Sequence, residues 1–268
     1  MNTLILHENE FAVFQKLIYS EVGIDLAASK RMLVQSRLTK RLHLYKLNSF
    51  VDYLRLVQIN AKERIEMINL ITTNETYFFR EIQHFEYLQN FILKQYTSLK
   101  MFRFWSAAAS VGAEAYSAAM LIANTRTSNS WEVVGTDINS EVIQKARIGL
   151  YPERWADKVP LPLKQKFCLK GKGKQEGQFL VDRVLVENMI FTTSNLMYHN
   201  KEVGLFDVIF LRNVLIYFDD ETKQLVIDNV VKNLKVGGYF FISLTENLNM
   251  LNIPNLEVVE TSVYKKIK

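Results

Sequence analysis

The sequence predicts an α/β fold with a mostly parallel sheet, preceded by an all-helical domain. Residues 11 to about 70 show helical periodicity and no strand signal. From about residue 100, short apolar runs alternate with amphipathic runs, which is the order of parallel strands connected by helices. Prolines and a Gly/Lys-rich turn interrupt this alternation at about 153–190. We therefore expect a helical domain at 1–72 and an α/β domain at 73–268, with a small inserted β-subdomain at about 153–190.

The composition is typical of a folded protein without membrane segments. The chain has 268 residues, of which 49% are hydrophobic, enough for one large or two unequal domains. The apolar runs are short, such as residues 208–211, so we expect no membrane insertion. The N-terminus lacks the basic flank of a secretion signal, and the single cysteine, Cys168, fits a reducing compartment. These features predict a cytoplasmic protein.

The helical part divides into four predicted helices. The run at 11–23 ends at Gly23, a typical helix C-cap, and residues 49–58 and 61–71 follow with helical spacing. Residues 30–46 form a basic amphipathic helix without an acid, with apolar positions at Leu33, Leu38, Leu42 and Leu44. The net charge of +5 favours an acidic partner. Charge alone leaves open whether this helix is a solvated face or a docking surface.

The α/β part begins at about residue 100. We expect strands at 101–105, 131–138, 206–211 and 236–244 and helices at 113–124, 139–150 and 219–234. Asn139 or Ser140 is expected to open the second of these helices. The run at 178–191 alternates like the strands of a hairpin, so we place it in the β-subdomain.

The small-residue segment 105–117, "WSAAASVGAEAYS", connects the first strand to the first helix. Asp137 ends the next strand, 25 residues after Gly112. Nucleotide-cofactor folds place a backbone-hugging loop and a ribose-binding carboxylate in this order. A role of Asp137 as a helix N-cap explains the aspartate almost as well. The loop lacks the glycine cluster that cradles a pyrophosphate, which counts against NAD and FAD and less against S-adenosylmethionine.

The run "TTNETYFFREIQHF" at 72–85 lies at the junction of the two domains, where ligand sites concentrate. Read by composition alone, Phe78 and Phe79 are core residues and Arg80 forms a surface ion pair with Glu81 or Glu86. The four histidines are scattered, so we expect no metal site.

Several motifs in a fixed order resemble the chemotaxis receptor methyltransferases of the CheR type. These are "NETYFFRE", "WSAAASVGAEAYSAAM", "GTDIN", "ARIGLYP", "SNL" and "FDVIFLRNVLIYFD", together with "LIYSEVGIDLAASKRMLVQSRLTKRL" in the helical domain. The resemblance extends from about Phe11 to about Leu248. It implies a Rossmann-like methyltransferase domain with a β-subdomain behind an all-helical domain.

The resemblance also implies a function and a site. Enzymes of this family transfer a methyl group from S-adenosylmethionine to glutamates on the helical cytoplasmic part of chemoreceptors. Arg80 and Tyr217 would then lie nearest the transferred methyl, and Arg37, Lys40 and Arg41 would dock the glutamate-rich receptor helices. The implied cofactor-binding residues are Asn74, Thr76, Arg80, Glu114, Asp137, Asn195, Leu196, Leu211 and Arg212. We expect a monomer that binds no nucleic acid, since the amino-methyltransferase Asn/Asp-Pro-Pro-aromatic motif is absent.

The sequence departs from the family pattern at three places, one of which is Leu211, where a cysteine is common. Val111, Ala113 and Ala115 replace a threonine, a glutamate and a proline of the usual loop, and Ser243, Leu244 and Thr245 stand where "GHS" is usual. A weakly catalytic adaptor that binds S-adenosylmethionine, or a methyltransferase for a protein carboxylate outside chemotaxis, therefore remains an alternative.

Overall fold

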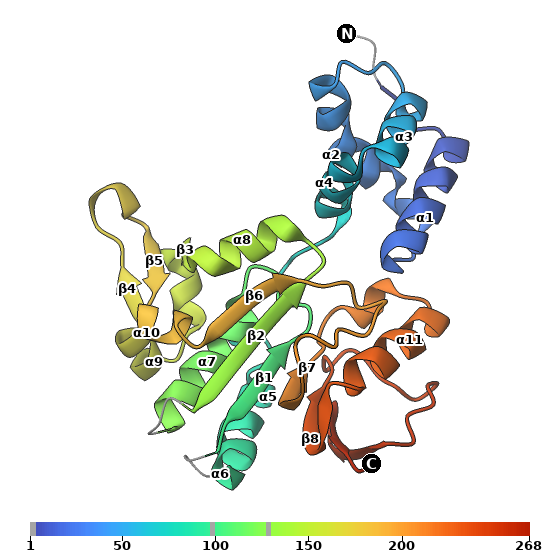
Figure 1. The fold of residues 1–268 in the computed structure, drawn as a ribbon. Helices are drawn as coiled ribbons and strands as arrows, with labels where there is room; N and C mark the ends of the chain where they lie inside the picture. Colours follow the sequence, from blue (N-terminus) through green and yellow to red (C-terminus); the bar gives the residue numbers. More distant parts are fainter. Residues whose placement is uncertain (1–3, 97–99, 127–129) are drawn as a thin grey trace.

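The structure is a computed structural model that describes residues 4–96, 100–126 and 130–268. It consists of a helical domain, a seven-stranded sheet covered on both faces, and a small three-stranded sheet beside it (Figure 1). In the described residues, no helix combines the length and the apolar character that crossing a membrane requires.

The helical domain folds as its sequence periodicity predicts. Gly23 ends the first helix with a φ of 74°, and the side chains of Ser49 and Asn60 cap the third and fourth helices. Aromatic rings of Phe14, Phe50 and Tyr53 meet in its core. Its elements are α1 (Glu8–Val22), a 3₁₀ turn (Ala28–Lys30), α2 (Arg31–Leu44), α3 (Phe50–Ile59) and α4 (Ala61–Ile71).

The central sheet has the strand order β6-β2-β1-β7-β8-β10-β9. Neighbouring strands from β6 to β8 pair in parallel, and β10 pairs antiparallel with both β8 and β9. The chain runs outward in one direction from β1 to β2 and in the other from β7 to β8. A parallel sheet opens a crevice at such a switch point, outside the carboxyl ends of the strands. The strands are β1 (Phe102–Ser106), β2 (Trp131–Asp137), β6 (Met189–Thr193), β7 (Phe206–Phe210), β8 (Leu234–Phe241), β9 (Leu256–Glu260) and β10 (Val263–Lys266).

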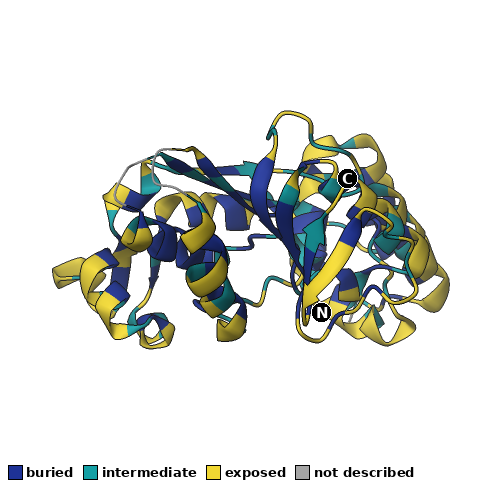
Figure 2. Ribbon diagram, turned by 90° about the horizontal axis from the view of Figure 1, so that it is seen from below, coloured by how far each residue is buried: buried dark blue, intermediate teal, exposed yellow. Residues whose placement is uncertain are grey.

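Alternate side chains of the central strands enter two separate cores. Phe104 and Phe210 pack under α5 and α7, whereas Trp105 and Ile209 pack against α11. Since successive residues of a strand point to opposite faces, these four residues place one hydrophobic layer on each side of the sheet. Figure 2 shows the central strands as largely buried and much of the outer helix surface as exposed. The helices are α5 (Ile82–Tyr87), a π-helical segment (Leu88–Ile92), α6 (Leu93–Gln95), α7 (Ala113–Thr125), α8 (Ser140–Ile148), a 3₁₀ turn (Leu215–Tyr217) and α11 (Asp220–Val231).

The β-subdomain differs from the sequence prediction. Its antiparallel sheet has the order β3-β5-β4, but residues 178–191 are not a hairpin. Asp182 accepts the backbone N–H of Val184 and starts a helical turn, after which β6 joins the central sheet beside β2. The apolar alternation of 178–191 therefore serves two different sheets. The elements are β3 (Leu150–Pro152), a 3₁₀ helix (Glu153–Lys158), α9 (Leu161–Phe167), β4 (Cys168–Lys170), a 3₁₀ turn (Gly173–Gln175), β5 (Gln178–Val181) and α10 (Arg183–Val186).

Candidate active site

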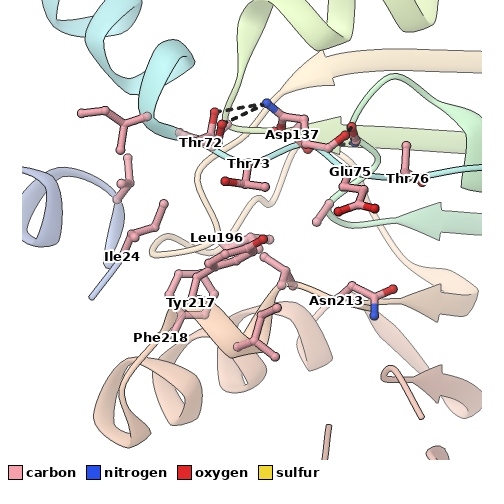
Figure 3. Close-up of a pocket in the computed structure, with 18 of the residues that line it drawn as sticks. Ile24, Thr72, Thr73, Glu75, Thr76, Asp137, Leu196, Asn213, Tyr217 and Phe218 are labelled. Carbon is pink, nitrogen blue, oxygen red and sulfur yellow. Dashed lines mark hydrogen bonds between the residues drawn. The ribbon is translucent and has the colours of Figure 1, made fainter. Parts of the chain in front are cut away.

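A cavity of about 440 Å³ lies at the switch point, between the carboxyl ends of the strands and the helical domain. This volume is within the usual range of small-molecule sites, roughly 300–1,000 Å³. Residues 22–27 and α2 supply one wall, the linker 71–76 a second, and the loops after β1, β2 and β7 the remainder. Figure 3 shows side chains from all three regions converging on this space. The site is therefore built by both domains.

The loop after β1 is shaped by unusual backbone angles and small residues. Ser110 and Gly112 have φ of 51° and 89°, and a Cβ on Gly112 would lie 2.9 Å from the Cβ of Ala146. Ala107, Ala108 and Ser110 line the cavity. The segment is thus both a tight packing corner, at Gly112, and a wall of the site.

Asp137 lies at the carboxyl end of β2 and faces the cavity (Figure 3). One carboxylate oxygen accepts the backbone N–H of Ser110 at 2.8 Å and the other accepts that of Asn139 at 2.9 Å. Burial raises the pKa of Asp137, and these backbone N–H groups oppose the rise. Asn139 is the N-cap of α8, because its side chain accepts the N–H groups of Glu141 and Val142. Asp137 is therefore not needed as the cap, and both of its oxygens retain lone pairs for a ligand.

Arg212 follows β7 and has a fully buried side chain. Its guanidinium pairs with Glu114 at 3.2 Å and with Glu81 at 3.1 Å, and it donates to the carbonyl oxygen of Arg80. Glu114 also accepts a hydrogen bond from Ser106, and burial raises its pKa against the effect of Arg212. The predicted cofactor residues Glu114 and Arg212 are thus one connected pair.

Glu81 is a residue of this network that sequence reasoning missed. It does not pair with Arg80, as the composition suggested. Arg80 instead donates to the carbonyl oxygen of Glu75 and lies over the ring of Tyr77. Glu81 has a φ of 56°, which points its carboxylate toward Arg212 rather than outward. The sequence feature that could have pointed to Glu81 as a site residue is its position directly after Arg80 in the motif "NETYFFRE".

Glu246 is a second missed residue, and it shapes the loop that carries Tyr217. Its carboxylate accepts backbone N–H groups from Asn213, Leu215 and Ser243 at 2.9–3.1 Å. Burial raises the pKa of Glu246, and these N–H groups oppose the rise. The carboxylate therefore fixes the turn that aims Tyr217 into the cavity.

The remaining predicted cofactor residues divide into those that line the cavity and one that does not. Asn74, Thr76 and Leu196 line it, and Leu196 lies beside the ring of Tyr217 (Figure 3). Leu211 is not among the residues that line the cavity: its side chain is buried in the core around α11, and its N–H donates to the carbonyl oxygen of Phe241. The strand register, with Arg212 facing the site, turns its neighbour Leu211 to the other face.

Asn195 lines the cavity, but its side chain is already engaged. Its amide donates to the carbonyl oxygen of Glu21 at 2.8 Å, and its carbonyl accepts the N–H of Met197. The backbone N–H of Asp25 similarly donates to the carbonyl oxygen of Tyr217 at 2.8 Å. These two bonds tie the helical domain to the loops of the site.

The expected docking residues do not form one outward face. Arg37 donates to the carbonyl oxygens of Ile71 and Thr72 and lines the cavity. Arg41 forms an ion pair with the buried Glu63. Lys40 is exposed, as are the apolar positions Leu33 and Leu44. Of the three cations, only Lys40 is free of the intramolecular bonds seen in the described residues.

Comparison with known proteins agrees with this geometry. The family model described as "CheR methyltransferase, SAM binding domain" matches residues 74–264. The model described as "CheR methyltransferase, all-alpha domain" matches residues 9–72. The range matched by the SAM-binding model contains the carboxyl ends of the strands that surround the cavity. S-adenosylmethionine is therefore the cofactor of this domain.

Curated relatives align over nearly their full length. The Chemotaxis protein methyltransferase of Escherichia coli is 38% identical over 253 residues, which are 92% of this chain and 87% of the relative. Chemotaxis protein methyltransferase 2 of Pseudomonas aeruginosa is 37% identical over 241 residues, 89% and 86% of the two chains. The protein of Borreliella burgdorferi is 33% identical over 272 residues, 97% and 94%. The chain therefore belongs to the CheR methyltransferase family.

Proposed function

We propose that this protein transfers the methyl group of S-adenosylmethionine to glutamate side chains of chemoreceptor cytoplasmic helices, forming glutamyl methyl esters. The observation that carries the proposal is the cavity itself. It places Asp137, the Glu114–Arg212 pair, Arg80 and Tyr217 around one space at the switch point. The names of the curated relatives supply the chemotaxis context.

The residues of the cavity fit this cofactor. The two oxygens of Asp137 suit the two ribose hydroxyls, since a carboxylate accepts several hydrogen bonds. Asn74, Thr76, Glu114, Arg212 and Leu196 would hold the rest of the molecule. The loop after β1 supplies small residues instead of a phosphate cradle, which suits a nucleoside joined to an amino acid.

The reaction requires little acid–base catalysis from the protein's own residues. The cofactor supplies an electrophilic methyl group on a sulfonium. A glutamate substrate has an unperturbed pKa of about 4.3 and is already ionised at neutral pH, so no general base is required. Arg80 and Tyr217 would orient the carboxylate in line with the methyl group, which is the main contribution to rate that such a site makes. Arg80 is partly engaged by Glu75 and Tyr77, so it would not fully neutralise the nucleophile.

Receptor recognition in this proposal begins at α2. Lys40 is exposed there and would attract glutamate-rich helices by charge complementarity. In this proposal the helical domain, which ends at residue 72, recognises the receptor, and the domain that follows it carries out the methyl transfer. The enzyme is cytoplasmic and monomeric.

The test is methyl transfer from labelled S-adenosylmethionine to a receptor cytoplasmic fragment. We expect label that base treatment releases as methanol, and no label on a fragment whose methylatable glutamates are replaced by alanine. Tight cofactor binding with no base-labile label on the receptor would identify an adaptor instead. Label on another protein's carboxylates, with none on the receptor, would identify a methyltransferase outside chemotaxis.

A further inference from the structure

Glu81 does not line the cavity itself, but it contacts two lining residues, Arg212 and Asn213. We propose that Glu81 is a positioning residue whose charge raises the affinity of the cavity for S-adenosylmethionine, a sulfonium cation, relative to that for its uncharged thioether product. The inference rests on the proposed use of this cofactor. It assigns a role in cofactor selection to a residue outside the lining.

Glu81 is held by hydrogen bonds from two separate segments of the chain, at Asn213 and at 243–244. Its carboxylate accepts hydrogen bonds from Asn213 at 3.2 Å, from the hydroxyl of Ser243 at 2.7 Å and from the N–H of Leu244 at 3.0 Å. Although burial alone would raise its pKa, Arg212 and these bonds lower the pKa of Glu81 to about 2. Glu81 is therefore a fixed negative charge at physiological pH.

Arg212 transmits this charge to the cavity. Its buried guanidinium is shared between Glu81 on one side and Glu114, a lining residue, on the other. Glu81 thereby adds one negative charge beside the cavity, and a neutral side chain at this position would remove that charge. Charges in a buried site are poorly screened, so the loss acts on a nearby ligand cation.

His84 is the other titratable group beside Glu81 in the described part of the chain, and it adds no charge. The imidazole of His84 lies 3.5 Å from the Glu81 carboxylate, and burial together with Arg212 lowers its pKa to about 4. His84 is thus neutral at physiological pH. The charged groups of the cluster are Glu81, Glu114 and Arg212, and Arg80 also acts on Glu114.

The cofactor and its product make this idea testable, because they differ by one methyl group and one positive charge. We expect Glu81→Gln to raise the ratio of the Kd for S-adenosylmethionine to the Kd for S-adenosylhomocysteine by about threefold or more, as expected for one lost charge at moderate distance. Titration calorimetry of the full chain with each compound measures both constants. Glu86→Gln is the matched control, since this exposed acid lies on α5, the helix that directly follows Glu81, and should leave the ratio unchanged.

Two further variants separate charge from shape. Glu81→Asp keeps the charge, so the wild-type ratio should survive even if both affinities fall. Ser243→Ala removes a neutral donor to Glu81, so both affinities should change by the same factor.

If Glu81→Gln shifts both constants equally, or not at all, the proposal is wrong. If Glu81→Gln does not fold, a changed ratio in Glu81→Asp overturns it instead. Failure of the wild-type chain to bind S-adenosylmethionine would reject the cofactor assignment, a separate result.

Discussion

Arg41 and Glu63 form a two-pronged ion pair between α2 and α4, in which both carboxylate oxygens of Glu63 accept from one guanidinium. Tyr53 donates a third hydrogen bond to the same carboxylate, and Glu63 is almost completely buried. Burial raises the pKa of Glu63, but Arg41 and Tyr53 bring it below its ordinary value. Arg41, which the sequence placed on the receptor-docking surface, therefore binds a buried carboxylate of the helical domain instead.

This pair predicts a loss of stability when one partner is removed. Arg41→Met leaves a buried carboxylate uncompensated, so we expect the free energy of unfolding to fall by about 3 kcal/mol. Urea unfolding of the full chain measures this change. Lys40→Met, on the same helix and exposed, is the control and should change stability by less than about 0.5 kcal/mol. Equal effects of the two variants would contradict the assignment.

Lys40 is the better test of receptor docking. Lys40→Glu should raise the KM for a receptor fragment by about threefold or more through charge repulsion, and the effect should shrink at high salt. Cofactor affinity should stay unchanged, because Lys40 does not line the cavity. Lys62→Glu makes the same change of charge at an exposed position of α4 and serves as the control. An unaltered KM in Lys40→Glu would leave the helix as a solvated face.

Asp137 is expected to bind the ribose, which S-adenosylmethionine and S-adenosylhomocysteine share. Asp137→Ala removes charge-assisted hydrogen bonds, so the Kd for S-adenosylmethionine and that for S-adenosylhomocysteine should each rise about tenfold or more. Calorimetry checks both values, and an unchanged affinity would refute the ribose assignment.

Tyr217 is expected to act on turnover rather than on cofactor binding. Tyr217→Phe removes a hydroxyl that orients the substrate carboxylate, and kcat should fall about tenfold or more while the Kd for S-adenosylmethionine stays the same. Initial rates and calorimetry separate the two effects. Tyr198→Phe, which changes an exposed tyrosine, should alter neither. A weakened cofactor affinity with normal kcat would place Tyr217 in the cofactor site only.

His84 predicts the dependence of stability on pH. Its folded pKa of about 4 lies below the ordinary 6.5, so the unfolded chain binds more protons between these values. The His84 contribution is fully present above pH 6.5, and about 3 kcal/mol of it is lost as the pH falls to 4. His84→Leu should remove this loss with little effect at pH 7.5, because the ring nitrogens have no hydrogen-bond partner among the described residues.

Urea unfolding at pH 7.5, 5.5 and 4 measures the His84 effect. Glu81 contributes in a different window, because its stabilisation is lost as the pH falls from about 4.5 toward 2. His43→Leu is the control, since His43 is exposed. A His84→Leu variant with the same pH slope as the wild type between 6.5 and 4 would show that folding does not lower the pKa of His84.

Local sequence signals were sufficient for most elements of the fold. The C-cap at Gly23, the N-cap at Asn139 and the switch from helical to alternating periodicity near residue 100 all appear in the structure as expected. These signals act over a few residues, because caps and periodicity depend on the backbone of one element. The same reasoning failed at 178–191, where two short strands with similar patterns belong to different sheets.

The sequence by itself determined the order of elements, the family motifs and the residue types around the cofactor. Only the tertiary structure decided which charges meet: Arg212 with Glu81 and Glu114, and Arg41 with Glu63. It also decided that Asn195 bonds Glu21 and that Leu211 faces the core. The physical reason is that these partners lie far apart along the chain. Packing of the sheet and the helical domain, rather than local backbone preference, brings them within hydrogen-bond distance.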